Sequence, residues 1–280
     1  MIMFDTITTL GNSLIQHGPF NQRIYLQKLS EQDFPEIIGN LDALATEKGY
    51  TKIFAKIPAY AKESFLHNNY EIEATIPEFY SGQQPVYFMG KYFSSTRKRI
   101  PNEDEIKKVL LTAQAKQEHK PVQIITPKNM NYRKCAETDC QQMAALYQAV
   151  FTTYPFPIQD PAYIRKTMKD NITYWGVWHH ERLIAVASAE TDYQAGNTEM
   201  TDFATLSAFR GENLSSLLLY ALENYIRDAG IKTAYTIARS ISYGMNITFA
   251  KKGYTYCGTL PNNTNISGGL ESMNVWYKQL

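Results

Sequence analysis

The sequence predicts an α/β fold of the α+β kind, in which the strands form a mixed sheet and the helices pack against it. Three observations predict it. A strand, a turn and a helix follow one another between Thr198 and Asp228, and a second strand and helix follow over residues 234–253. The order helix, strand, helix, strand, strand describes residues 214–278 and also residues 34–93. A chain of 280 residues is long enough for two domains.

The unit at 198–228 is the clearest of these elements. Residues 199–206 alternate between two faces, as a strand does, and from Leu214 to Ile226 leucines recur at helical spacing. Gly230 is expected to end the helix. Unpaired backbone N–H groups and the helix dipole make the start of such a helix a site for an anion. A strand–turn–helix unit without a ligand has the same pattern, and neither a nucleotide P-loop nor a G-x-G-x-x-G run occurs.

Residues 1–93 predict a first domain. Its expected elements are a strand or hairpin within 1–22, strands at 23–29, 51–57, 70–76 and 86–93, and helices at 34–47 and from Pro58 to about 68. Residues 94–130 are expected to be a linker that contains a helix from Asn102 to about Glu118 and a short strand at 122–125.

Residues 131–280 predict a second domain, which begins with a strand at 132–135, helices at 139–151 and 161–168, and strands at 173–178 and 183–193. His179 and His180 fall at a turn and have no third partner at metal-ligand spacing, so no metal site is expected.

Composition excludes several classes of protein. A net charge of +1 gives no surface for a phosphate backbone, so nucleic-acid binding is not expected. No apolar run reaches the roughly 20 residues that cross a bilayer, and the N-terminus lacks signal-peptide features. Three cysteines without metal spacing are typical of reduced thiols in a cytoplasmic protein. The oligomeric state stays open, and a homodimer is one arrangement.

The turn before the leucine-rich helix resembles that of the GNAT acyl-CoA N-acyltransferases. Their motif Gln/Arg-x-x-Gly-x-Gly/Ala aligns with Arg210-Gly211-Glu212-Asn213-Leu214-Ser215. Asn213 and Ser215 depart from it. Asn is the non-glycine residue that most readily takes a positive φ, and Ser is small. The resemblance implies a GNAT fold for 131–280 and a truncated GNAT-like domain for 1–93, which either covers the sheet or contributes substrate contacts.

A subfamily, the β-lysine N6-acetyltransferases, is similar over more of the chain, at residues 48–56, 154–157, 199–205, 234–239, 242–250 and 262–266. This resemblance implies an enzyme that transfers acetyl from acetyl-CoA to the ε-amine of β-lysine by direct attack in a ternary complex. Its product, N6-acetyl-β-lysine, is a compatible solute for osmoadaptation. The alternatives are a GNAT enzyme for another small amine, such as a polyamine or lysine, and a non-catalytic acyl-CoA-binding protein.

The resemblance also implies positions for the catalytic and cofactor sites. A general base is expected at Glu199 or Asp202, which a strand period of 2 places on opposite faces. Backbone N–H groups of Phe203, Ala204 and Thr205 would polarise the thioester carbonyl. The diphosphate would bind the backbone of Arg210, Gly211, Glu212, Asn213, Leu214 and Ser215, with Asn246 and Phe249 beside the cofactor.

Two assignments stay open at this point. In many members of the family a tyrosine donates a proton to the departing thiolate, and its position here is occupied by Phe249, which has no proton to donate. Either Tyr243 or a water donates that proton, or the reaction proceeds without a dedicated acid. Arg239 would bind either the substrate carboxylate or a CoA phosphate. The other expected substrate contacts are the acidic Glu190, the aromatic Tyr154 and Phe156, and Asn265, which otherwise makes a turn.

Overall fold

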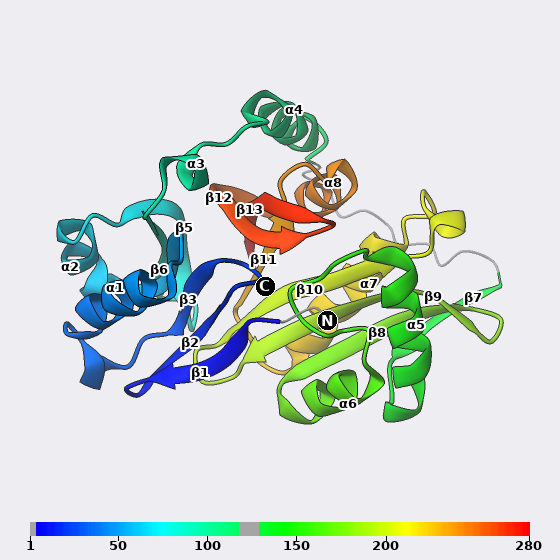
Figure 1. Cartoon of the computed structure of the whole chain (residues 1–280). Coiled ribbons are helices and arrows are strands. Elements are labelled where there is room, and N and C mark those ends of the chain that lie inside the picture. The colour runs from blue at the N-terminus through cyan, green and yellow to red at the C-terminus, as the bar shows by residue number, and fades with distance from the viewer. Residues whose placement is uncertain (1–3, 118–128) are drawn as a thin grey trace.

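A computed structural model describes residues 4–117 and 129–280. Its strands form one mixed sheet in the order β1-β2-β3-β4-β6-β5-β12-β13-β11-β10-β9-β8-β7 (Figure 1). The strands are β1 (Thr6–Leu10), β2 (Ser13–Gly18), β3 (Arg23–Lys28), β4 (Lys52–Pro58), β5 (Glu71–Tyr80), β6 (Gln84–Tyr92), β7 (Met130–Lys134), β8 (Ile172–His179), β9 (Arg182–Asp192), β10 (Asn197–Thr205), β11 (Thr233–Arg239), β12 (Thr255–Ile266) and β13 (Gly269–Gln279). The α-helices are α1 (Ile37–Lys48), α2 (Lys62–His67), α3 (Ser95–Lys98), α4 (Glu103–Gln114), α5 (Cys140–Val150), α6 (Pro161–Asp170), α7 (Leu214–Asp228) and α8 (Tyr243–Lys251).

The sheet has related halves. In the N-terminal half β3 runs parallel to β4, and α1 connects them; in the C-terminal half β10 runs parallel to β11, and α7 connects them. Each pair is followed by a helix and an antiparallel hairpin, β5–β6 or β12–β13. The hairpin β1–β2 precedes β3 as β8–β9 precede β10, so the strand or hairpin expected within 1–22 is a hairpin. It takes the place of the first strands that a truncated domain would lack. The mixed α/β prediction is confirmed.

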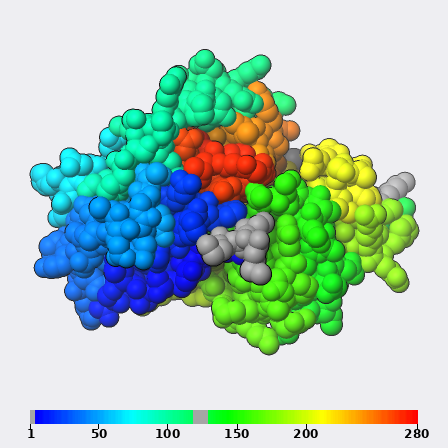
Figure 2. Space-filling view, viewed as in Figure 1, coloured from blue at the N-terminus to red at the C-terminus, as the bar shows by residue number. Residues whose placement is uncertain are grey.

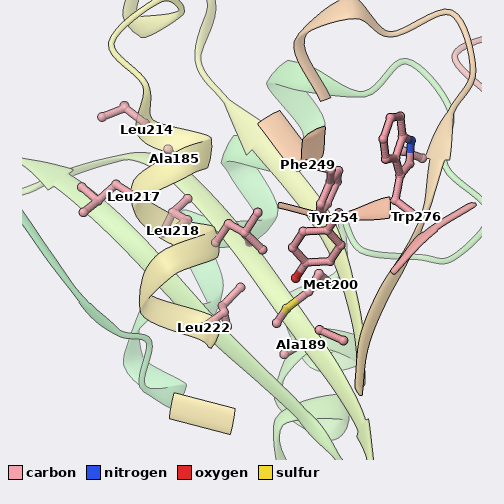
Figure 3. Close-up of a cluster of buried hydrophobic side chains, with 14 of the residues drawn as sticks. Ala185, Ala189, Met200, Leu214, Leu217, Leu218, Leu222, Phe249, Tyr254 and Trp276 are labelled. Atoms are coloured by element: carbon pink, nitrogen blue, oxygen red, sulfur yellow. The ribbon is translucent and has the colours of Figure 1, made fainter. Parts of the chain in front are cut away.

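The leucine-rich helix α7 forms the core of the C-terminal half. Leu217, Leu218 and Leu222 pack in one buried cluster with Ala189 and Met200 of the sheet (Figure 3). The helical spacing of the leucines puts them on one face, so burial of this face against β8–β10 fixes where the helix begins beside the end of β10.

The two halves meet where β5 pairs with β12, so hairpin β12–β13 of the C-terminal half lies at their junction (Figure 2). Gly258 has a φ of +152°, and a side chain there would collide with the backbone of Glu73 and Ala74, so this approach requires glycine. Behind it Lys52 is fully buried and forms an ion pair with Glu73 at 2.8 Å. Asn262 donates from Nδ2 to the carbonyl oxygens of residues 97 and 99, which ties the hairpin to the chain after β6.

Most predicted element positions agree with the structure within a few residues. Helix α4 ends at Gln114, short of the expected Glu118, and the strand expected at 122–125 lies outside the described residues. Among the described helices none is long and apolar enough to span a membrane.

Candidate active site

The sheet opens between β10 and β11. The two strands pair only over Asn197–Glu199 and Thr233–Tyr235, after which β10 continues beside β9 and β11 beside β13. The edge of β10 beyond Glu199 that faces β11 therefore has no strand partner. A cavity of about 620 Å³ occupies this region, and residues of both halves line it.

The turn before α7 is open to solvent. Gly211 and Asn213 have φ values of +93° and +58°, so Asn213 takes the positive φ that its residue type allows. The first described hydrogen bond of the helix runs from the N–H of Leu217 to the carbonyl of Asn213. Among the described residues no acceptor meets the backbone N–H groups of 214–216, and residues 210–213 are exposed. This is the geometry of an anion site at a helix start.

Glu199 lines the cavity at the point where the strands separate. The pKa of its carboxyl is raised to about 8, chiefly by desolvation and next by the like charge of Glu190, directly opposite on β9. Lys56 and the hydrogen bond with the Tyr235 hydroxyl act in the other direction. A carboxyl with a pKa near 8 exchanges protons readily near neutral pH.

Asp202 lies on the same cavity, and this corrects the expectation that Glu199 and Asp202 occupy opposite faces. The register of β10 shifts between Thr201 and Ala204, and Asp202 itself has a φ of +54°. A β-bulge adds a residue to one strand and so breaks the period of 2. Both carboxylate oxygens accept hydrogen bonds, from Ser188 at 2.6 Å and from Tyr154 at 2.5 Å. Asp202 thereby fixes the loop that carries Tyr154.

Four of the predicted substrate residues line the cavity: Tyr154, Phe156, Glu190 and Arg239. Arg239 forms two hydrogen bonds with Glu271, from Nε at 2.8 Å and Nη2 at 2.6 Å, so its fork already has a carboxylate.

Asn265 does not line the cavity, contrary to the prediction. Its backbone N–H donates to Oδ1 of Asn21, and its Nδ2 donates to the carbonyl of Phe20. The side chain links the β12–β13 hairpin to the N-terminal half.

The predicted contacts on α8 also change. Asn246 is fully buried, donates to the carbonyls of Arg239 and Ser242, and accepts from Trp276 and one further amide, so the polar atoms of its side chain already have partners within the protein. Phe249 lines the cavity and packs against Phe203.

Tyr243 lies at the first residue of α8, 37% exposed, and is not among the residues that line the cavity. Ser242, one residue earlier, does line the cavity, where its hydroxyl caps the helix by accepting from the N–H of Met245.

The residues that sequence reasoning missed come from the N-terminal half. Arg23 and Tyr25 of β3, Gln16 of β2, and Phe54 and Lys56 of β4 all line the cavity. A signal was present in β4, where Lys52 and Lys56 share one face of a strand that is otherwise apolar, since a lysine on a buried strand requires a partner. Among the described residues no three His, Cys, Asp or Glu side chains are arranged to hold a metal ion.

Comparison with known proteins decides the family. The model of the acetyltransferase (GNAT) family matches residues 142–244. The chain is 41% identical to the β-lysine N(6)-acetyltransferase of Methanococcus maripaludis over 98% of both chains. It belongs to the GNAT acetyltransferase family. It is therefore an acyltransferase with acetyl-CoA as cosubstrate.

Two further comparisons concern a second relative and a solved structure. This GNAT enzyme is 35% identical to the N-acetyltransferase YodP of Bacillus subtilis, over 99% of this chain and all of the relative. A crystal structure of an N-acetyltransferase from Staphylococcus aureus covers 54% of this chain and 99% of its own, with a TM-score of 0.48 and 16% identity.

Proposed function

We propose that this enzyme transfers the acetyl group of acetyl-CoA to the ε-amine of β-lysine and so produces N6-acetyl-β-lysine. The observation that carries the proposal is the cavity between the halves, which joins carboxylates of the C-terminal half to cations of the N-terminal half. Such a cavity suits a small zwitterion that bears both amines and a carboxylate. The name of the Methanococcus relative, similar over almost its whole length, supports the same substrate.

The proposed reaction is a direct attack in a ternary complex. The diphosphate of acetyl-CoA binds the N–H groups at the start of α7, and the thioester lies between β10 and β11. Glu199 accepts a proton from the ammonium, the free amine attacks the thioester carbonyl, and backbone N–H groups within Phe203–Thr205 stabilise the oxyanion. The oxyanion then collapses, the C–S bond breaks and CoA leaves as a thiolate. The second proton of the attacking nitrogen passes through water in the open cavity to this thiolate, which leaves a neutral amide and free CoA.

Release of free CoA tests the substrate. With acetyl-CoA, the protein is expected to release thiol rapidly with β-lysine and to place the acetyl group on the ε-nitrogen, as NMR of the product would show. L-Lysine and spermidine serve as comparison substrates. A higher kcat/KM for either of them than for β-lysine would overturn the substrate assignment and favour the other small amine.

A substitution at the helix start tests the diphosphate site. Ser215→Asp adds a carboxylate at the second position of α7, where it stabilises the helix dipole but repels a diphosphate. We expect KM for acetyl-CoA to rise about tenfold or more, with no fall in Tm. Asn224→Asp on the same helix makes the same change in net charge and should leave KM unchanged. Equal KM values for both variants would place the cofactor elsewhere.

The proposed product carries one ammonium and one carboxylate and is net neutral. We propose that it accumulates in the cytoplasm as a compatible solute, so the enzyme would contribute to osmoadaptation.

A further inference from the structure

Arg23 is a buried cation without a carboxylate partner. It begins β3, is 5% exposed and lines the cavity. Its Nη1 donates to the carbonyl of Asn263, but within residues 4–117 and 129–280 no carboxylate lies at ion-pair distance and no acceptor meets its buried Nε. The rings of Tyr25 and Phe54, 5.4 Å and 5.6 Å from the guanidinium carbon, hold the group in place.

Carboxylates act on Arg23 only from a distance, and two of them, Glu73 and Asp5, are engaged by other groups. Lys52 and Arg97 are also buried, and Lys52 is the one ion-pair partner of Glu73 in the part of the chain that the structure describes. Asp5, whose charge also acts on Arg23, is occupied by the amides of residues 20 and 21. Burial lowers the pKa of Arg23 to about 10, so it stays protonated at neutral pH. A buried charge is stabilised when a counter-ion arrives, and the cavity is the open route for one.

A second unpaired donor lies beside this cation. Gln16 is 1% exposed, lines the cavity, and has a buried Nε2 with no acceptor among the described residues. In the β2–β3 pair, Gln16 is opposite Tyr25 and Gly18 is opposite Arg23, so Gln16 and Arg23 share a face as diagonal neighbours. An arginine fork and an amide N–H₂ on one face match the acceptor oxygens of a carboxylate.

We propose that Arg23, with Gln16 beside it, binds the carboxylate of the amino-acid substrate, so that the N-terminal half determines specificity for an amino acid over a simple diamine. The inference rests on the proposed function and replaces the role expected of Arg239, whose fork Glu271 already occupies. Glu199 is close enough for its charge to act on Arg23. One small molecule can therefore place its amine at Glu199 and its carboxylate at Arg23.

Substrate pairs that differ only in the carboxylate test this role. β-Lysine and its decarboxylated analogue 1,4-diaminopentane are compared in the wild type, in Arg23→Gln and in the matched control Arg239→Gln. We expect Arg23→Gln to raise KM for β-lysine by about 10- to 100-fold and to change kcat/KM for the diamine by less than about threefold. Arg239→Gln should keep the wild-type ratio of the two kcat/KM values.

A second variant guards against loss of the fold. Arg23→Lys keeps the buried charge but not the fork, so it should fold and lose part of the preference for β-lysine. The inference is overturned if both Arg23 variants lower activity on the two substrates equally, or if the preference disappears in Arg239→Gln. Failure of the proposed function is separate, because the wild type would then release no CoA with β-lysine. In that case L-lysine and cadaverine supply the matched pair.

Discussion

Glu199→Gln is expected to lower kcat by about 10²- to 10⁴-fold, the contribution of a positioned general base. The substitution keeps the size of the side chain and its place beside Tyr235 but removes the group that accepts the proton from the ammonium. KM for acetyl-CoA should change little, because the diphosphate is expected at the start of α7. Steady-state rates of CoA release at saturating substrates measure the effect.

Glu190→Gln is the matched control for that experiment. Glu190 lies directly opposite Glu199 and raises its pKa, so its removal should shift the pH dependence to lower pH without abolishing turnover. A Glu199→Gln enzyme that keeps more than about a tenth of the wild-type kcat would contradict the assignment of the base.

Glu73→Gln is expected to reduce the free energy of unfolding by about 3–5 kcal/mol, the usual cost of removing one partner of a buried ion pair. Lys52 would stay buried without its counter-ion, and the one amide oxygen of the glutamine would replace the two carboxylate oxygens that accept from Lys52 and from the Tyr92 hydroxyl. The shift of the urea midpoint measures the loss.

Two variants on the same strands control for this result. Glu71→Gln on β5 removes an exposed pair with Lys98, so it should cost less than about 1 kcal/mol. The double variant Lys52→Met, Glu73→Gln removes both charges and should recover most of the loss. If Glu73→Gln costs no more than Glu71→Gln, the buried pair does not stabilise the junction of the halves.

The fold was predictable because its signals are local. Helical spacing of leucines, a glycine after the last turn and alternation on strands act within one element, and Asn213 takes its positive φ by residue type. The site was predictable only in part. The bulge at Asp202 changes which side chains share a face, and no pattern in 199–205 indicates it.

The other misses depend on contacts distant in sequence. Asn246 and Asn265 look like polar ligands, but tertiary neighbours take up their hydrogen bonds. Arg239 finds a carboxylate in Glu271, 32 residues away. The role of the N-terminal half in lining the cavity follows from its junction with β12, which no local pattern reveals.

The dependence of kcat/KM on pH tests the central claim that Glu199 is the proton acceptor. The carboxyl must be ionised to accept a proton, so the wild-type kcat/KM for the amine should rise as pH increases through a pKa near 8. In Glu199→Gln that inflection should be absent, which leaves only the titration of the substrate amine at higher pH. An unchanged inflection in the variant would contradict the account.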